Sequence, residues 1–364
     1  MLMGARELTE LTSKERVIAA IEQDDCDRIP IAPPFQGYWA LGLAGLTVKE
    51  SIQKPVLAAR AQIEANRRCG FDALESMWDW LSPVEALGCE VKIPESGEIL
   101  TGGHLICGPS SLDSISVPEP TEDYRFISAM EASKRLTEAI GDKTFLYGTL
   151  CCPFTLIGEL RGVEPLMLDI VAEPSFAIEM LHLATEALEG YCEYLVRAGV
   201  DGVILCDPTA SGSLVSGREF EVFSQPFMKQ CGRIVKKEGG KLLVHICGDA
   251  TDRLHSIADI GSEVFSLDYQ VDLRAAKEAI GDKLTLLGNV NPSLLFNGRP
   301  GDVKKACHTC VSKTHGERFI LGAGCDIVPG TPIENIEVWK EEAFRPGTTH
   351  LARHAHTDKK TRHH

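Results

Sequence analysis

With 364 residues, the chain is long enough to bury one large α/β core or two medium ones. Its net charge of −15 argues against nucleic acid as a partner, because phosphate binding needs a basic surface. The 13 cysteines, an odd number without a secretory signal, indicate free thiols in a reducing compartment, so we expect a cytoplasmic protein. No apolar stretch is long enough to cross a bilayer, and no membrane partner is expected.

The first third of the chain mixes helices and strands. An amphipathic helix opens at 13–16, and a strand is predicted over 27–33. A helix over 55–68 and a strand over 71–77 follow. The stretch 84–107 differs, because two short apolar pairs flank Pro-Glu-Ser-Gly, which is typical of a β-hairpin.

From residue 144 onward, strands and helices alternate regularly. Strands are predicted at 145–148, 203–206, 242–247, 264–267, 284–288 and 319–321. Helices are predicted near 154–162, 174–198, 218–237, 251–259, 271–279 and 302–314. Such a series implies parallel strands joined by crossover helices, as in a barrel or an open doubly wound sheet.

The length of the series favours the barrel. No Gly-x-Gly-x-x-Gly follows an early strand, which weakens the nucleotide-binding alternative. We therefore predict an α/β protein with a (β/α)8 TIM-barrel fold, an N-terminal helical extension and a β-hairpin insertion. We expect residues 1–345 to form a single domain. The tail 346–364, rich in His, Arg, Lys and Thr, cannot build a core and is expected to be disordered.

The most informative pattern is His245-Ile246-Cys247 at the end of an apolar run, with Cys325 at the end of a later one. Residues two apart in a strand share a face, so His245 and Cys247 project the same way. Structural zinc sites usually have four protein ligands, whereas three leave a position for water or substrate. The pattern therefore predicts a catalytic zinc held by His245, Cys247 and Cys325.

Core packing is the alternative reading, because Cys is among the residue types most often buried. The position of all three residues at strand ends favours the metal, since barrel active sites form where strands end. Asp207 and Asp268 also follow predicted strands. We expect Asp207 to act as a general base or to orient substrate. Asp268 is expected to ligate the metal or to support His245. For either carboxylate, capping the next helix is the competing role.

Several motifs resemble the uroporphyrinogen decarboxylase superfamily, and His245, Cys247 and Cys325 resemble its zinc-dependent corrinoid methyltransferase branch, which includes methylcobamide:coenzyme M methyltransferases. The true decarboxylases carry an arginine-rich N-terminal segment, but residues 33–39 here contain no arginine. The matching stretches are 13–16, 27–30, 85–88, 152–155, 207–211, 245–248, 288–292, 324–326 and 331–335.

The resemblance implies a methyltransferase that moves a methyl group from a methylated corrinoid, carried on a partner protein, to a small thiol such as coenzyme M. It implies Zn²⁺ as the cofactor and a separate corrinoid protein as the partner. Three alternatives stay open: demethylation of an O-, N- or S-methyl substrate with transfer to the corrinoid, uroporphyrinogen decarboxylation, and a non-enzymatic corrinoid scaffold. The methyl acceptor is not specified by the sequence.

Overall fold

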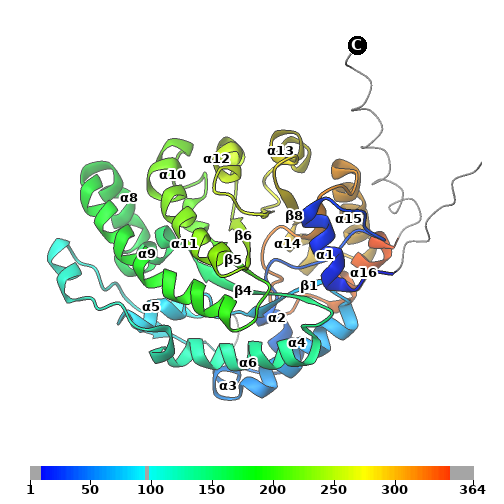
Figure 1. Ribbon diagram of the computed structural model, residues 1–364, viewed down its shortest axis with the longest axis horizontal. Helices are drawn as coiled ribbons and strands as arrows, with labels where there is room; N and C mark the ends of the chain where they lie inside the picture. The colour runs from blue at the N-terminus through cyan, green and yellow to red at the C-terminus, as the bar shows by residue number, and fades with distance from the viewer. Residues whose placement is uncertain (1–9, 95–97, 345–364) are drawn as a thin grey trace, which may run out of the picture.

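A curled sheet of parallel strands forms the centre of the computed structural model, which describes residues 10–94 and 98–344 (Figure 1). Each strand pairs with its neighbour in parallel, and spatial order follows chain order. The strands are β1 (Ala73–Met77), β4 (Phe145–Cys151), β5 (Gly202–Cys206), β6 (Lys241–Ile246), β7 (Val264–Leu267), β8 (Thr285–Val290) and β9 (Phe319–Ala323). The TIM-barrel-like α/β fold expected from the sequence is confirmed.

A short extended segment closes the ring between β9 and β1. Ile31 forms a parallel bridge with Leu321, and the Asp72 N–H donates to the Ile31 carbonyl at 2.7 Å. The strand predicted over 27–33 is therefore wrong in length, since it is reduced to one bridging residue. Pro30 and Pro33 flank the bridge, and proline has no N–H to donate to a neighbouring strand.

Helices surround the sheet and cover one of its ends (Figure 1). They are α1 (Ser13–Glu22), α2 (Gly37–Leu43), α3 (Val48–Gln53), α4 (Pro55–Cys69), α5 (Ser82–Ala86), α6 (Tyr124–Ile140), α7 (Pro153–Arg161), α8 (Val163–Ala172), α9 (Pro174–Arg197), α10 (Gly217–Phe223), α11 (Gln225–Lys237), α12 (Leu254–Ala258), α13 (Leu273–Ile280), α14 (Pro292–Asn297), α15 (Pro300–Thr314) and α16 (Ile333–Ala343).

The N-terminal helical extension is confirmed as α1. Thr12 caps it, and a reciprocal bond from the Thr12 N–H to the Glu15 carboxylate completes a capping box. The helix predicted over 218–237 is instead two helices, α10 and α11. They separate at Ser224 because Pro226 offers no N–H to continue the hydrogen-bond ladder.

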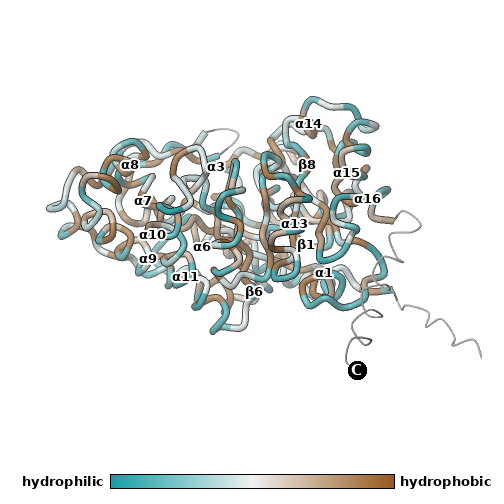
Figure 2. The backbone as a smooth tube through the Cα atoms, turned by 90° about the horizontal axis from the view of Figure 1, so that it is seen from above, coloured by the Kyte–Doolittle hydropathy of each residue, from teal (hydrophilic) through white to brown (hydrophobic). Residues whose placement is uncertain are grey.

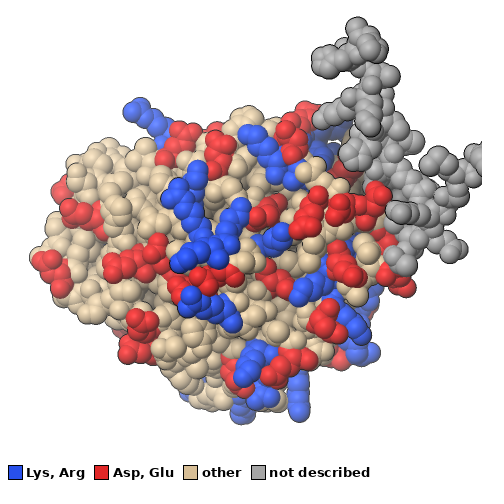
Figure 3. Space-filling view, viewed as in Figure 1, with Lys and Arg blue, Asp and Glu red and all other residues tan. Residues whose placement is uncertain are grey.

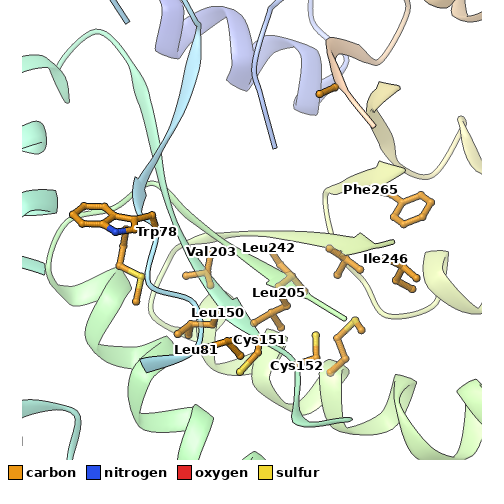
Figure 4. Packing of buried hydrophobic residues seen from close by; sticks show 14 of the residues in the cluster. Trp78, Leu81, Leu150, Cys151, Cys152, Val203, Leu205, Leu242, Ile246 and Phe265 are labelled. Atoms are coloured by element: carbon orange, nitrogen blue, oxygen red, sulfur yellow. The ribbon is translucent and has the colours of Figure 1, made fainter. Parts of the chain in front are cut away.

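Two hydrophobic layers hold the barrel together. The larger lies between strands and helices, and Figure 4 shows part of it around β4, β5 and β6. Hydrophobic segments run through the middle of the molecule, and hydrophilic turns mark its edges (Figure 2). The smaller layer fills the barrel interior with Val17, Ile21, Ala32, Ala73, Phe145, Tyr147, Ile204, Leu243, Val264, Leu287 and Ile320. Two residues of α1, Val17 and Ile21, are thus part of the packing inside the barrel.

The predicted hairpin insertion is confirmed. The strands β2 (Val91–Lys92) and β3 (Leu100–Thr101) pair antiparallel, apart from the main sheet. Residues 95–97 at the turn lie outside the described residues, as does the predicted tail 346–364. The assignment of 1–345 to one domain stays a prediction. Within the described ranges, no helix is both long and apolar enough to span a membrane.

Candidate metal centre

The ends of β6 and β9 bring the three predicted metal ligands together. His245 is the second-last residue of β6, and Cys247 follows the strand directly. Cys325 lies just beyond β9. His245 Nε2 is 3.2 Å from Cys247 Sγ, which is 3.6 Å from Cys325 Sγ. His245 also interacts with Cys325 through its side chain. The predicted convergence of these residues is therefore present in the fold.

Strand alternation explains the orientation of His245. Leu243, two residues earlier, lies in the barrel interior, whereas Val244 and Ile246 belong to the layer under the helices. His245 is fully buried at the next interior level above Leu243. The side chain that carries the ligand atom therefore points into the barrel mouth.

Two separations between predicted ligand atoms are close to those of a zinc site. In a tetrahedral site with Zn–S near 2.3 Å and Zn–N near 2.1 Å, ligand atoms lie roughly 3.6–3.8 Å apart. The 3.2 Å and 3.6 Å separations differ from those values by only a few tenths of an ångström. One imidazole and two thiolates are also a donor set that zinc prefers. A small movement of the side chains would complete the site.

Ser266, on β7, fixes the imidazole ring of His245. His245 Nδ1 lies 3.1 Å from the Ser266 carbonyl oxygen and 3.0 Å from its hydroxyl oxygen. A proton on Nδ1 satisfies the carbonyl and leaves the Nε2 lone pair free to bind a metal. The Phe35 ring packs edge-on against the imidazole, with ring centroids 4.9 Å apart. The ring is thus held in the orientation that metal binding requires.

Both thiols are difficult to ionise without a cation. A hydrogen bond with Cys206 and burial raise the pKa of Cys247, although its contact with Cys325 acts in the opposite direction. The interaction with Cys247 and burial raise the pKa of Cys325. A divalent metal offsets this cost, because a coordinated thiol is held as the thiolate.

Cys206 is a third sulfur beside the site, and the sequence reasoning did not select it. It ends β5 and pairs in register with His245. The ligand atoms of Cys206, His245 and Cys247 all lie within 4.8 Å of one another. The bond with Cys247 lowers the pKa of Cys206, but burial and neighbouring groups raise it further, to about 12. Its position at a predicted strand end, directly before Asp207, was the available signal.

Asp207 follows β5 directly, and its carboxylate is bonded to residues in or next to the surrounding helices. Its carboxylate accepts hydrogen bonds from the Thr155 hydroxyl at 2.6 Å and the Ser224 hydroxyl at 2.5 Å. Its backbone N–H donates to the His245 carbonyl at 2.9 Å. Burial raises the pKa of Asp207 to about 6, against the lowering effect of both hydroxyls. These contacts join β5 and β6 to the helices, and a catalytic role for Asp207 stays a prediction.

Asp268 follows β7, as predicted, and is almost completely buried. Its carboxylate accepts a 2.9 Å hydrogen bond from the Gln270 N–H, and its charge contributes to the raised pKa of Cys247. Like the predicted ligand Cys325, it lies outside the tight group of Cys206, His245 and Cys247 found among the described residues. Its direct participation in metal binding stays a prediction.

A cavity of about 250 Å³ opens beside the sulfur atoms. The hairpin insertion supplies one wall, α7 supplies another, and the end of β1 together with the loop before α2 supplies a third. The residues that line it are Phe35, Tyr38, Glu75, Trp78, Trp80, Leu81, Glu98, Ile99, Leu100, Thr101, Glu159, Cys206, Pro208, Cys247, Cys325 and Asp326. The candidate thiol ligands Cys247 and Cys325 therefore face a space that a small molecule could occupy.

Glu75 and Asp326 are lining residues that the sequence analysis did not single out. Glu75 lies inside strand β1, and its carboxylate accepts from backbone N–H groups that are distant in sequence. In the sequence alone it therefore looks like any other strand residue. Asp326 follows Cys325 directly, and burial raises its pKa well above the usual range. A carboxylate next to a predicted ligand was a usable signal, whereas nothing local distinguished Glu75.

The sequence pattern of the uroporphyrinogen decarboxylase (URO-D) family matches residues 12–344. The chain belongs to the uroporphyrinogen decarboxylase family. The match covers residues 12–344 and is therefore not confined to one motif. The family resemblance inferred from the sequence is confirmed.

Relatives of this URO-D protein have names of two kinds. It is 28% identical over 336 residues to the methylcobamide:CoM methyltransferase MtaA of Methanosarcina barkeri, covering 91% of this chain and 97% of that protein. It is 27% identical to a uroporphyrinogen decarboxylase of Synechococcus sp., covering 84% of this chain and 86% of that protein. A solved methyltransferase structure from Methanosarcina mazei matches with a TM-score of 0.84 at 26% identity, covering 92% and 98% of the two chains.

Proposed function

We propose that this protein is a zinc-dependent methyltransferase that moves a methyl group from a methylated corrinoid protein to a small thiol. The convergence of His245, Cys247 and Cys325 beside a cavity is the observation that carries the proposal. The similarity to proteins named methylcobamide:CoM methyltransferases supports it. In this proposal the three residues hold the metal, and the fourth position is left to the substrate.

The residues of the chain bind and orient the thiol. Zinc, when bound, supplies Lewis acidity that lowers the pKa of a coordinated thiol. The cavity wall positions the substrate sulfur next to Cys247 and Cys325, while the apolar lining excludes water. The thiol proton is released, a sulfur–carbon bond forms with the methyl group, and the electron pair of the cobalt–carbon bond stays with the corrinoid.

Two catalytic alternatives from the sequence analysis use the same fold. The reverse transfer, from an O-, N- or S-methyl substrate to the corrinoid, would use the same ligands. Decarboxylation of a porphyrinogen is supported by the Synechococcus relative, but porphyrinogen carboxylates need cationic partners. No Arg or Lys is among the described residues that line the cavity. We therefore favour the methyltransferase.

A cytoplasmic setting is part of the proposal. All 13 cysteines are unpaired in the structure, and thiols survive in a reducing compartment. A 250 Å³ cavity is smaller than the roughly 300–1,000 Å³ of typical ligand pockets, so a corrinoid would have to remain outside it. We propose that a separate corrinoid protein presents the methyl group at the barrel mouth.

Zinc content and methyl transfer test the proposal together. We expect about one zinc per purified wild-type chain, strongly reduced in Cys247→Ser and Cys325→Ser, because three protein ligands provide the binding energy. Cys206→Ser is the matched control and should keep its zinc. Thiol-dependent demethylation of methylcobalamin, followed by absorbance, should fall at least 100-fold in the two ligand variants, the upper range for damage to a metal site.

The control separates an open site from a closed one. If Cys206→Ser loses zinc as completely as Cys247→Ser, the metal has four protein ligands and the proposed open position is wrong. A wild-type protein that folds but binds no zinc would overturn the methyltransferase proposal and make decarboxylation the next activity to assay.

A further inference from the structure

The cavity beside the metal ligands carries acidic side chains and no basic ones. Glu75, Glu98, Glu159 and Asp326 all line it, and within the described part of the chain no Lys or Arg does so. The carboxyl groups influence each other, since the neighbouring Glu159 contributes, after burial, to the raised pKa of Glu98. A sulfonate or carboxylate placed here would find no cationic side chain among these lining residues and would meet like charge on each carboxyl group that is ionised.

Two basic side chains whose elements or ion-pair partners adjoin the cavity lining, Arg161 and Arg125, are already paired. Arg161 lies in the same helix as Glu159, and its Nε donates to Asp169 at 2.8 Å. Arg125 forms ion pairs with Asp79 and Glu85. Because these guanidinium groups have carboxylate partners of their own, neither is available to anchor an anion in the cavity.

Aromatic rings complete the lining. Phe35, Tyr38, Trp78 and Trp80 all face the same space. Aromatic faces attract organic cations through their quadrupole, and ammonium groups are bound by rings combined with carboxylates in this way. The composition of the wall is therefore suited to a positive charge.

Two buried polar atoms in this wall have no partner among residues 10–94 and 98–344. Trp78 is only 2% exposed, and its Nε1–H has no acceptor. Asp326 Oδ1 is buried without a donor. Buried polar groups are almost always hydrogen-bonded, so an unpaired donor and acceptor in a cavity wall indicate a polar ligand. An ammonium group could donate to Asp326 Oδ1, whereas the Trp78 N–H needs an acceptor atom elsewhere on the ligand.

We propose that the thiol bound in this cavity carries an ammonium group at the end remote from its sulfur, and not the sulfonate of coenzyme M. This inference rests on the proposed function for its thiol, but the charge preference follows from the cavity alone. In the reaction the sulfur loses its proton and gains the methyl group, the cobalt–carbon electron pair stays with the corrinoid, and the ammonium group is unchanged. Its contribution is to binding and position.

Three thiols of the same two-carbon length test the charge directly. They are 2-aminoethanethiol, 2-mercaptoethanol and 2-mercaptoethanesulfonate, which end in an ammonium, a hydroxyl and a sulfonate. With zinc-loaded protein and methylcobalamin, we expect KM to be lowest for the aminothiol and at least about tenfold higher for the sulfonate. KM is the quantity to compare, because differences in thiol reactivity enter kcat.

Binding without chemistry gives a second readout. Choline and isethionate lack a thiol and need neither metal nor corrinoid, and their binding can be followed by the fluorescence of Trp78 and Trp80 in the wall. Choline should bind at least about tenfold more tightly than isethionate. Removal of one wall charge in Glu98→Gln or Glu159→Gln should weaken choline binding about fivefold.

Glu164→Gln is the matched control. Glu164 is an exposed carboxylate on the neighbouring helix α8 and does not line the cavity, so choline affinity should not change. In Glu164→Gln the KM for 2-mercaptoethanol should also stay within about twofold.

The two readouts distinguish the possible failures. A sulfonate KM equal to or below that of the aminothiol, or isethionate binding as tightly as choline, would overturn the inference even if methyl transfer is observed. If none of the thiols demethylates methylcobalamin, the proposed function fails. Choline binding that depends on Glu98 and Glu159 would then still support a cation site, and its absence would overturn that site too.

Discussion

Glu75 shows how one buried carboxyl group organises the cavity wall. Its Oε2 accepts from the N–H groups of Gln36 and Gly37 at 3.0 and 2.9 Å, and its Oε1 accepts from the Thr149 hydroxyl at 2.7 Å. These bonds tie the start of α2 to β1 and β4. Burial outweighs them and raises the pKa of Glu75 from 4.5 to about 7.

The raised pKa of Glu75 predicts a pH-dependent stability. The folded state holds the proton more tightly than the unfolded state, so this contribution is complete below pH 4.5 and is lost as the pH rises to about 7. Between these values the wild type should lose about 3 kcal/mol of unfolding free energy relative to Glu75→Gln, which has no such proton. Denaturant unfolding of both proteins across this range measures the difference. Parallel pH profiles would contradict the assignment.

At this scale the sequence predicted which side chains converge at the candidate site but not their surroundings, and metal binding by them stays a prediction. His245 and Cys247 could be placed on one face because strand side chains alternate, and both proved to converge with Cys325. Glu75 could not be found in this way, since its partners at Gln36 and Gly37 are distant in sequence. Long-range contacts of this kind carry no local signal.

At the scale of elements, an ion network stabilises the closure of the barrel. Asp72, fully buried at the start of β1, accepts from Arg16 and Arg28 and from the Ile31 N–H at 2.9 Å. One carboxylate thus links α1, the bridging segment and β1. The Ile31 segment contributes few backbone hydrogen bonds of its own to the junction between β9 and β1. The stability of this junction, called the seam below, therefore depends on Asp72.

Neutralising Asp72 should open this seam. Asp72→Asn would leave two guanidinium groups near the barrel with less compensation, and breaking a buried pair costs roughly 3–5 kcal/mol. We expect a loss of this size in the free energy of unfolding, measured by urea denaturation. Asp259→Asn, at an exposed carboxylate 3.9 Å from Lys283, is the control and should change stability by less than about 0.5 kcal/mol. Equal losses in both variants would contradict a special role for the seam.

The element pattern was predictable where strands and helices alternate and less so where proline intervenes. Periodicity placed β4 to β9 and the helices between them, because buried parallel strands are continuous apolar runs. The same reasoning gave a full strand over 27–33 and a continuous helix over 218–237. Pro30, Pro33 and Pro226 remove the N–H groups that those elements would need.

At the scale of the molecule, negative charge is spread unevenly. In the view of Figure 3, the end that carries α8 and α9 shows acidic groups among uncharged atoms, while basic side chains gather over the middle and the opposite end. The net charge is −15. The basic groups are interspersed with acids, so this face offers no continuous positive stripe to a phosphate backbone.

We therefore predict no measurable affinity for duplex DNA. Fluorescence anisotropy of a labelled 20-base-pair duplex at 50 mM salt should stay flat up to about 100 μM protein, where even non-specific DNA-binding proteins bind detectably. A rise in anisotropy that disappears at 200 mM salt would reveal a basic surface on another face and contradict this expectation.

The hairpin insertion places part of the cavity wall outside the sheet that positions the predicted metal ligands. The predicted metal ligands lie at the ends of β6 and β9, whose register is fixed by the barrel, whereas Glu98 and Thr101 reach the cavity from β3 and the residues before it, outside the main sheet. A lineage could lengthen, shorten or replace this hairpin without disturbing the strands below it. Such a division would let descendants of one barrel keep a single reaction while exchanging the compounds on which they perform it.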